Sequence, residues 1–370
     1  MLSRRRLLLA AGALAAPTIG PTVGADVTFP DVVPRTLRFP EDFGAHPDFR
    51  TEWWYLTGWL GEPGQRPGRP LGFQITFFRV RTGVGPDNPS AFAARQLVIA
   101  HAALADRARG KLLLDERIAR TGFGLVDTRT GDTDARLDGW SLTRDPATDT
   151  YFGQVAARGF TLKFRAASQR PPWLQGAAGL SRKGPLPTQA SYYYSRPQLQ
   201  VEAELSVAAV AAPAKMQGVA WLDHEWSSSA LAPDAAGWDW VGMNLDDGSA
   251  LLAFQIRRQG ARADEAPLQR YAAWRSPAGD TRVIDPTTLH FTPQRQWTST
   301  RSRAAWPIAQ RIQVGDRRFQ TVPLMPDQEL DSRLTTGAVY WEGASTLLEG
   351  GRPVGRGYLE MTGYVEPLRL

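Results

Sequence analysis

Carboxyl, imidazole and indole side chains gather in two short runs between residues 221 and 240 of this chain. The first run is Trp221-Leu222-Asp223-His224-Glu225-Trp226 and the second is Trp238-Asp239-Trp240. Carboxyl and imidazole groups are common proton donors and acceptors in enzymes, and indole rings stabilise a nearby cation. These residue types predict acid–base chemistry beside an aromatic surface. The candidate catalytic residues are Asp239, His224, Asp223 and Glu225.

Both runs are typical of β-strands, in which alternate side chains share a face. Asp223 and Glu225 are therefore expected to point one way, and His224 to point the other way beside Trp226. Asp239 shares its predicted face with apolar residues at positions 241, 243 and 245. If that face is the interior of a barrel, burial raises the pKa of the carboxyl group. A carboxyl group that stays neutral can donate a proton near neutral pH.

A structural role is the alternative for each of these residues. Tryptophan is a common core residue, and a carboxylate beside it often accepts an indole N–H or caps a turn. For Asp223, Glu225 and Glu52 the structural role is the preferred interpretation, whereas for His224 and Asp239 both roles remain open.

Strand-like runs must position these side chains. Residues 51–60 and 71–80 are aromatic and β-branched on either side of a Gly- and Pro-rich loop, which predicts a β-hairpin. Residues 238–257 predict a second hairpin that turns at Asp246-Asp247-Gly248. Residues 96–109 fit either a helix or a region that begins with a strand, and the strand is the preferred interpretation. Further strands are predicted at 96–104, 139–144, 151–156, 160–166, 191–194 and 198–207. The predicted fold class is mainly β.

Length and composition favour two domains. The chain has 370 residues, of which 42% are hydrophobic, and domains usually contain about 100 to 200 residues. We expect a leader at 1–25, an N-terminal domain at 36–208 and a C-terminal domain at 209–370. The pair Glu52-Trp53 followed by Phe-Gln-Ile recurs as Glu225-Trp226 followed by Phe-Gln-Ile. This recurrence indicates either a duplicated β-domain or a coincidence.

The first 25 residues resemble a twin-arginine export signal. Arg4, Arg5 and Arg6 precede a short apolar run that is too short to span a membrane. Removing this leader lowers the net charge from +6 to +3, and the remaining basic residues are scattered. We therefore expect a periplasmic or secreted protein with no transmembrane segment in the mature chain. Nucleic acid is not an expected partner.

Several common chemistries lack their sequence signature. The chain contains no cysteine, so disulfides, zinc–thiolate sites and cysteine nucleophiles are excluded. It also lacks the Gly-x-Ser-x-Gly, His-Glu-x-x-His, Gly-x-Gly-x-x-Gly and Walker patterns. We expect no metal and no cofactor.

Four motifs in the same order resemble the carotenoid 1,2-hydratase and AttH-like family, from about residue 40 to the C-terminus. The motifs are His46-Pro47-Asp48-Phe49-Arg50-Thr51-Glu52-Trp53-Trp54-Tyr55, Trp221 to Trp226, Gly237 to Trp240 with Leu245 to Gly248, and Tyr340-Trp341-Glu342-Gly343-Ala344 with Gly357 to Tyr364. The resemblance implies two packed lipocalin-like antiparallel β-barrels. Such barrels hold an apolar ligand in the interior or between domains.

The resemblance also implies addition of water across a carbon–carbon double bond of an apolar isoprenoid, without a cofactor. Asp239 or Asp223 would protonate the alkene, and His224 would orient or deprotonate the water. The residues expected to contact the substrate are Trp226, Trp240, Trp53, Trp54 and Tyr55. The alternative function is a non-catalytic lipid-binding protein of the periplasm, with an ABC-type permease as its partner.

Overall fold

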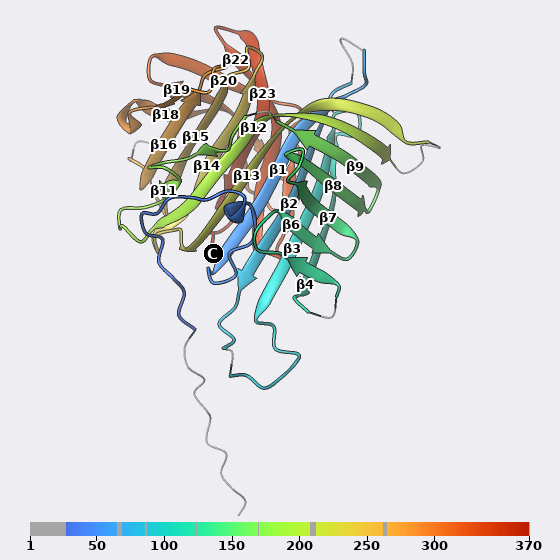
Figure 1. Ribbon diagram of the computed structural model, residues 1–370. Helices are drawn as coiled ribbons and strands as arrows, with labels where there is room; N and C mark the ends of the chain where they lie inside the picture. The colour runs from blue at the N-terminus through green and yellow to red at the C-terminus, as the bar shows by residue number, and fades with distance from the viewer. Residues whose placement is uncertain are drawn as a thin grey trace, which may run out of the picture.

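The computed structural model describes residues 27–64, 69–85, 87–122, 124–168, 170–207, 212–261 and 265–369. The predicted leader at 1–25 and the predicted domain boundary at 208–209 lie outside these residues. The described chain forms two antiparallel β-sheets, which lie side by side in Figure 1. Its helical elements are two short 3-10 turns, η1 (Glu41–Phe43) and η2 (Pro286–Thr288). The mainly β prediction is confirmed.

The first sheet has 13 strands and takes up the N-terminal part of the chain. In spatial order its main path is β4 (Lys111–Arg120), β3 (Gln96–Asp106), β2 (Leu71–Arg81), β1 (Thr51–Gly61), β13 (Ala214–Ser229), β12 (Ala190–Val207), β9 (Phe160–Ala167), β8 (Thr150–Ala157), β7 (Trp140–Asp145), β6 (Asp134–Leu137) and β5 (Val126–Thr128), while β10 (Trp173–Leu174) and β11 (Leu180–Arg182) pair with β12. Strands β3 and β4 at one end approach β5 and β6 at the other. The sheet is therefore a nearly closed barrel.

The second sheet has 10 strands and comes from the C-terminal part of the chain. Its main path is β17 (Thr281–Val283), β16 (Gln269–Arg275), β15 (Ala250–Arg258), β14 (Ala235–Leu245), β23 (Arg352–Thr362), β22 (Ala338–Glu349), β20 (Arg317–Pro323), β19 (Ala305–Val314) and β18 (Leu289–Thr298), while β21 (Glu329–Ser332) pairs with β22. Two barrel-like antiparallel sheets thus pack together, as the sequence predicted.

Both predicted hairpins are present. Strands β1 and β2 pair with Leu56 opposite Ile75, and β14 pairs with β15 around the turn at residues 246–248. The helix alternative for residues 96–109 is wrong, because β3 occupies 96–106 and pairs with β2 along its whole length. The predicted strands at 191–194 and 198–207 are one strand, β12, whose pairing shifts between Arg196 and Leu199.

Strand β13 belongs to the first sheet, although the sequence placed residues 209–370 in the second domain. It lies between β1 and β12, with Trp53 opposite Glu225 and Glu52 opposite Trp226. The two Glu-Trp pairs are therefore neighbours in one sheet and are not equivalent positions of two domains. The sheets divide between the end of β13 at Ser229 and the start of β14 at Ala235. Main-chain pairing to β1 and β12 makes β13 an interior strand of the first sheet.

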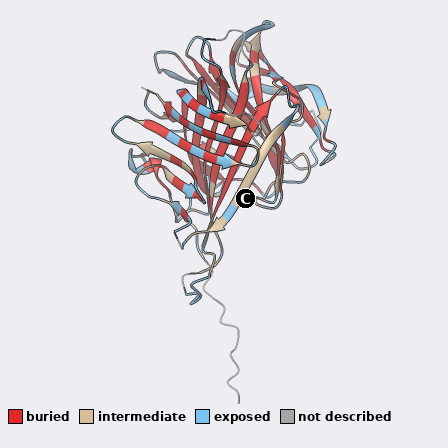
Figure 2. Ribbon diagram, turned by 90° about the vertical axis from the view of Figure 1, so that its right-hand side faces the viewer, coloured by how far each residue is buried: buried red, intermediate tan, exposed pale blue. Residues whose placement is uncertain are grey.

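The three larger hydrophobic clusters of the described chain follow from strand alternation. Trp54 and Leu56 of β1 point into the first barrel, whereas Tyr55 and Trp59 point toward the second sheet. A separate cluster around Val241 fills the second barrel. Strands between the barrels are therefore buried on both faces, and Figure 2 shows these central strands as buried almost throughout, whereas β8 and β9 alternate between buried and exposed residues.

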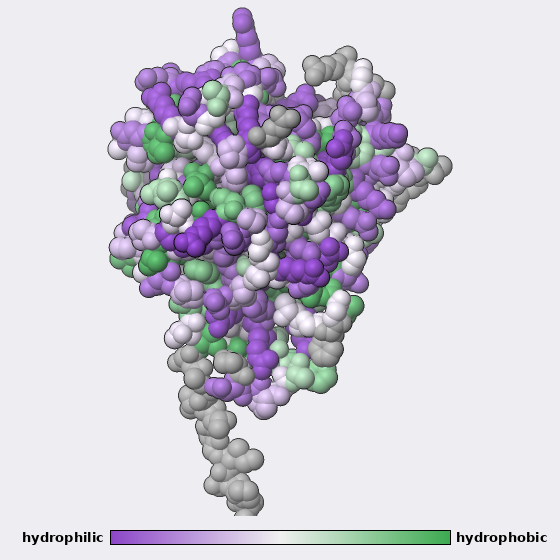
Figure 3. Space-filling view, viewed as in Figure 1, coloured by the Kyte–Doolittle hydropathy of each residue, from purple (hydrophilic) through white to green (hydrophobic). Residues whose placement is uncertain are grey.

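On the face seen in Figure 3, hydrophilic residues predominate and the hydrophobic ones appear as separate patches. Among the described residues, no helix has the length and apolar character needed to cross a membrane.

Candidate active site between the two sheets

A cavity of about 330 Å³ lies between the two sheets. Strands β1, β2, β3, β12 and β13 form one wall, and β14, β15, β22 and β23 form the other. Most of the wall is aromatic or aliphatic; this apolar lining includes Trp53, Tyr55, Phe78, Ile99, Trp238, Trp240, Phe254 and Ile256. A cavity of this size and lining is typical of sites for small apolar molecules.

Besides Glu52, which is described below, four carboxyl groups line this apolar cavity. Asp223 and Glu225 come from β13, where alternation directs both side chains toward the second sheet. Glu342 of β22 and Glu360 of β23 are direct cross-strand partners on the opposite wall. Side chains opposite each other on neighbouring strands lie about 5 Å apart at Cβ. The fold therefore brings together acids that are more than 100 residues apart in the chain.

Glu342 and Glu360 favour the protonated form. Burial raises the pKa of both carboxyl groups, and the charge of Glu360 adds to the rise at Glu342. Tyr55 donates a hydrogen bond of 2.7 Å to Glu342 Oε2. Glu342 is almost fully buried, whereas Glu360 keeps part of its side chain accessible. Two adjacent carboxyl groups in an apolar wall cannot both ionise easily, so the pair holds a proton near neutral pH.

Asp223 lies among neutral hydrogen-bond donors. It accepts hydrogen bonds from Tyr193 OH (2.5 Å), Ser195 Oγ (2.6 Å) and Trp221 Nε1 (2.7 Å). Burial raises the pKa of Asp223 to about 7, because these donors offset only part of the desolvation and the nearby charge of Glu225 adds to it. The carboxyl group is therefore close to its titration midpoint at neutral pH.

Glu225 is the ion-paired acid of the cavity. Lys183, which follows β11, places Nζ 2.9 Å from Glu225 Oε1, and Ser191 Oγ donates to the same oxygen at 2.5 Å. The ammonium group also lies over the rings of Tyr193 and Phe254, 4.6 and 4.3 Å from their centroids. An ammonium partner favours the ionised carboxylate. The cavity thus combines protonated carboxylic acids with a paired carboxylate.

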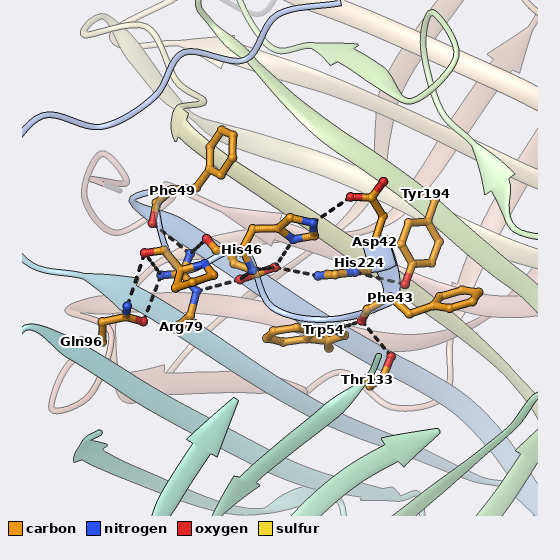
Figure 4. A network of polar contacts seen from close by, with 12 residues as sticks. Asp42, Phe43, His46, Phe49, Trp54, Arg79, Gln96, Thr133, Tyr194 and His224 are labelled. Carbon is orange, nitrogen blue, oxygen red and sulfur yellow. Dashed lines mark hydrogen bonds and ion pairs between the residues drawn. The ribbon is translucent and has the colours of Figure 1, made fainter. Parts of the chain in front are cut away.

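His224, Trp226 and Trp54 lie on the other face of β13 and β1, inside the first barrel. There His224 Nε2 lies 2.9 Å from Glu52 Oε1, and His46 Nδ1 lies 2.7 Å from the same atom. Figure 4 shows His46, His224 and Arg79 around this point. The two imidazole rings stack on the indoles of Trp226 and Trp54. We call Glu52 and its hydrogen-bond donors the Glu52 hub.

The Glu52 hub holds an ionised carboxylate in a fully buried position. Glu52 Oε2 accepts from Arg79 Nε at 2.6 Å and from the His46 backbone N–H at 2.9 Å. Burial favours the neutral acid, but the hydrogen bonds from His224 and His46 and the charges of His46 and Arg79 outweigh it and hold the pKa of Glu52 well below its usual range. The negative charge of Glu52 holds the surrounding N–H donors in place through these hydrogen bonds.

The two imidazoles of the hub differ in charge. His46 lies between Glu52 and Asp42, 2.9 Å from Asp42 Oδ1, and these two carboxylates outweigh burial and raise its pKa. Burial lowers the pKa of His224, whose Nδ1 lies 3.0 Å from Tyr194 OH. Two carboxylate acceptors suit an imidazolium at His46, and one carboxylate with one hydroxyl suits a neutral ring at His224.

Ligand atoms of His46, Glu52 and His224 lie within 4.8 Å of one another, a spacing that also suits a metal ion. However, both Glu52 oxygens already accept N–H donors, one of them from the guanidinium of Arg79. A cation there would have to displace two imidazole protons and lie beside a buried positive charge. The donor set fits a hydrogen-bonded hub better than a metal site.

Asp239 faces the interior of the second barrel with the apolar residues at 241, 243 and 245, as the alternation predicted. It accepts hydrogen bonds from Gln255 Nε2 (2.7 Å), Tyr364 OH (2.9 Å) and Arg257 Nε (3.2 Å). Asp239 is therefore a paired carboxylate on the far side of β14 from the cavity.

The structure thus separates the residues singled out from the sequence. Asp223, Glu225, Trp53, Tyr55 and Trp240 line the cavity. His224, Trp226, Trp54 and Asp239 lie in the barrel interiors.

The sequence analysis assigned no role to Glu342, Glu360 or Lys183. A signal for the two glutamates exists: Tyr340 precedes Glu342 by two residues, and Tyr358 precedes Glu360 by two. A tyrosine and an acidic residue two positions apart lie on the same face of a strand, and they indicate a polar face when the other face is apolar.

A family model and solved structures place the chain among known proteins. A family model described as AttH-like matches residues 30–364. The crystal structure of a candidate AttH protein from Nitrosomonas europaea superposes with a TM-score of 0.83 at 52% identity, covering 91% of this chain and 100% of that chain. A search of curated protein sequences finds no significant match.

Two distant solved structures share the fold. Kievitone hydratase from Nectria haematococca gives a TM-score of 0.66 at 14% identity, covering 90% of this chain and 94% of that chain. CghA with Sch210972 gives a TM-score of 0.50 at 12% identity, covering 92% of this chain and 98% of that chain.

Proposed function

Because this chain belongs to the AttH-like family and carries protonated acids in an apolar cavity, we propose that it is a hydratase-like enzyme. It adds water across a carbon–carbon double bond of an apolar isoprenoid by acid catalysis. The observation that carries the proposal is the Glu342–Glu360 pair, whose raised pKa keeps a carboxylic acid available in a wall of aromatic rings. Kievitone hydratase from Nectria haematococca, which has the same fold, adds weaker support.

The first step of the proposed reaction is protonation of the alkene. Glu360 is the preferred acid because its side chain is partly accessible, whereas Glu342 is almost fully buried and hydrogen-bonded to Tyr55. Transfer of the Glu360 proton to the less substituted carbon leaves a tertiary carbocation. The rings of Trp53, Trp238 and Trp240 supply π-faces that stabilise this cation.

Addition of water completes the proposed reaction. Glu225 is the preferred base because Lys183 stabilises its ionised form. The oxygen of a cavity water bonds to the carbocation, and one water proton passes to Glu225. One proton has then left Glu360 and one has reached Glu225, so the product is the alcohol and the net change is addition of one water. Asp223 has a pKa near 7, so it can accept the proton from Glu225 and donate a proton to Glu360.

Turnover of defined alkenes tests the proposal. We would incubate the purified mature chain with an acyclic carotenoid and with a phenol bearing a dimethylallyl chain, in isotopically labelled water. Tertiary alcohol that carries the label supports the proposal. Recovery of both alkenes unchanged, from protein that binds them, contradicts it.

A non-catalytic lipid-binding role is the second candidate, and the predominantly apolar cavity wall favours it. It predicts a lipid that co-purifies with the chain and is released unchanged on extraction, with an ABC-type permease as the partner that receives it. Binding that survives neutralisation of Glu360 and Asp223, without turnover, supports this role.

We also propose export through the twin-arginine route, on the basis of Arg4, Arg5 and Arg6 and the short apolar run that follows. The reaction then takes place outside the cytoplasm. Cell fractionation of the wild type and of a variant with both Arg5 and Arg6 changed to lysine tests this: the wild type is expected in the periplasmic or secreted fraction and the variant in the cytoplasm.

A further inference from the structure

A chain of hydrogen bonds leads from the cavity wall toward the surface through residues that the proposed reaction does not use. Tyr340 of β22 lines the cavity and its hydroxyl hydrogen-bonds to Nδ1 of His101 on β3. His101 Nε2 lies 3.1 Å from Thr335 Oγ1, in the turn between β21 and β22. Thr335 Oγ1 donates to Glu116 Oε2 of β4 at 2.7 Å. His101 is fully buried, whereas Glu116 is partly exposed.

The direction of each hydrogen bond in this chain follows from its neighbours. Thr335 uses its proton on Glu116, so its oxygen must accept from His101 Nε2–H. Burial lowers the pKa of His101 to about 3, so the ring is neutral and carries one proton. With that proton on Nε2, Nδ1 must accept from the Tyr340 hydroxyl. His101 and Thr335, the two residues between Tyr340 and Glu116, therefore each donate one hydrogen bond and accept one.

This alternation is what proton transfer along a hydrogen-bonded chain requires. If the Tyr340 oxygen takes a proton from the cavity, its own proton passes to His101 Nδ1, the Nε2 proton to Thr335 Oγ1, and the Thr335 proton to Glu116. One proton enters, one leaves, and no intermediate residue keeps a charge. Glu116 then releases the proton to solvent.

The inner end of the chain lies close to the cavity acids. Tyr340 and Glu342 are two residues apart on one face of β22, which places their Cα atoms about 7 Å apart. The charge of Glu342 contributes to the raised pKa of Tyr340, so the two groups are near each other, and a water molecule in the cavity can bridge a gap of this kind. The proposed hydration leaves Glu225 protonated and Glu360 ionised, so Glu360 must regain a proton before the next turnover. A substrate that fills the cavity hinders proton exchange with solvent through the mouth. A second route is useful there, and because each transfer reverses the hydrogen bonds of the chain, it passes protons outward and inward in turn.

We propose that Tyr340, His101, Thr335 and Glu116 form a proton relay that exchanges protons between the cavity and the surface while the cavity is occupied. The role in turnover rests on the proposed function, whereas the relay itself does not. The alternative is structural: the bond between His101 and Tyr340 joins β3 to β22 and thereby ties the two sheets together.

The first test needs no substrate. In the chain labelled with nitrogen isotope at histidine, NMR is expected to show His101 neutral with its proton on Nε2, and the Thr335→Val variant is expected to change the His101 signals. A proton on Nδ1, or on both nitrogens, breaks the relay and overturns the proposal.

The second test measures proton exchange of the buried carboxylic acids. The cavity is filled with the hydrogenated form of the dimethylallyl phenol, which cannot be hydrated, and exchange of the acid protons after transfer to heavy water is followed by infrared spectroscopy. Thr335→Val is expected to slow this exchange roughly tenfold. Thr336→Val is the matched control, because Thr336 also lines the cavity but donates only to the Ser332 carbonyl. Equal exchange in the two variants overturns the proposal.

The third test separates the relay from the sheet-joining role. His101→Ala is expected to slow turnover of the alkene probe roughly tenfold or more, and added imidazole to restore it, whereas pyrrole, which lacks the acceptor nitrogen, does not. Restoration by both compounds shows that His101 only fills space. If the wild type itself hydrates no probe, the proposed function fails, and the first two tests still decide on the relay.

Discussion

Two groups of buried carboxyls lie on either side of strands β1 and β13, and they favour opposite charge states. Glu52, on the barrel side of β1, receives N–H donors from two histidines, an arginine and the backbone, and its pKa is held well below the usual range. Asp223 and Glu360, on the cavity side, receive no hydrogen bond from a guanidinium group of the described residues, and burial raises their pKa. Burial is common to both groups. The partners therefore decide whether a buried carboxyl remains an anion that organises structure or becomes an acid that can react.

The alternation of β13 is the physical origin of this difference. Asp223 and Glu225 point between the sheets, and His224 points into the first barrel. Because neighbouring residues on a strand face opposite sides, a sequence run that looks like one catalytic cluster supplies two separate sites.

The largest effect is expected when the cavity acid is neutralised. Glu360→Gln keeps the shape of the side chain but removes the proton donor, so hydration of the alkene probe should fall about 10²- to 10⁴-fold. Folding should be retained, because the wild-type side chain is itself disposed to be neutral. Product formation under saturating substrate measures the effect, with the exposed Glu366→Gln as the control. Turnover within twofold of the wild type removes Glu360 from the mechanism.

The same substitution in the hub should cost stability. Glu52→Gln leaves the buried guanidinium of Arg79 without its carboxylate, which typically costs about 3 to 5 kcal/mol of unfolding free energy. Urea unfolding measures this loss. The matched control is Glu202→Gln, which breaks an exposed pair with Arg165 and should cost about 1 kcal/mol or less. Equal losses in the two variants would mean that the hub contributes no more than a surface ion pair.

The cost of Glu52→Gln should depend on pH. A lowered pKa in the folded state gives stability that is present above the unfolded pKa of about 4.3 and is lost as pH falls toward the folded value. The difference between wild type and variant should therefore be full at pH 6 and shrink on acidification. A difference that grows below pH 4 contradicts an ionised Glu52.

Asp223 should show the opposite dependence. Its folded pKa of about 7 exceeds the unfolded value of about 3.9, so the folded state binds more protons between these values and stability falls as pH rises through that window. Asp223→Asn should remove this fall, gaining on the order of 4 kcal/mol relative to wild type at pH 8 compared with pH 4. Unfolding curves across this range measure it. Parallel pH profiles for the two proteins would show that the folded-state pKa is not raised.

The smallest effects are expected from the indoles of the two regions. Trp240→Phe removes a large π-face from the cavity and should slow hydration roughly three- to tenfold. Trp226→Phe removes the ring that stacks on His46 at 3.8 Å, so it should lower stability but leave the activity of the folded protein unchanged. Kinetics and urea unfolding on both variants test the contrast. Loss of activity in Trp226→Phe alone would place the chemistry in the hub.

Local patterns in the sequence determined much of the fold. Alternating aromatic and β-branched residues bounded by Gly and Pro located the hairpins at 51–80 and 238–257, because side-chain period and turn chemistry are properties of neighbouring residues. The same period separated Asp223 and Glu225 from His224. It could not show which of these faces meets a cavity.

Only the tertiary structure decided where the acids meet and what charge they carry. Strand β13 joins β1 across more than 150 residues of sequence, and Glu342 and Glu360 reach the wall opposite Asp223 from the last two strands of the chain. Strand partners and register depend on how whole sheets pack, which a local period does not encode. The partners of Glu52 and of Asp239, and therefore the charge of each buried carboxyl, depend on side chains that only folding brings within hydrogen-bond distance.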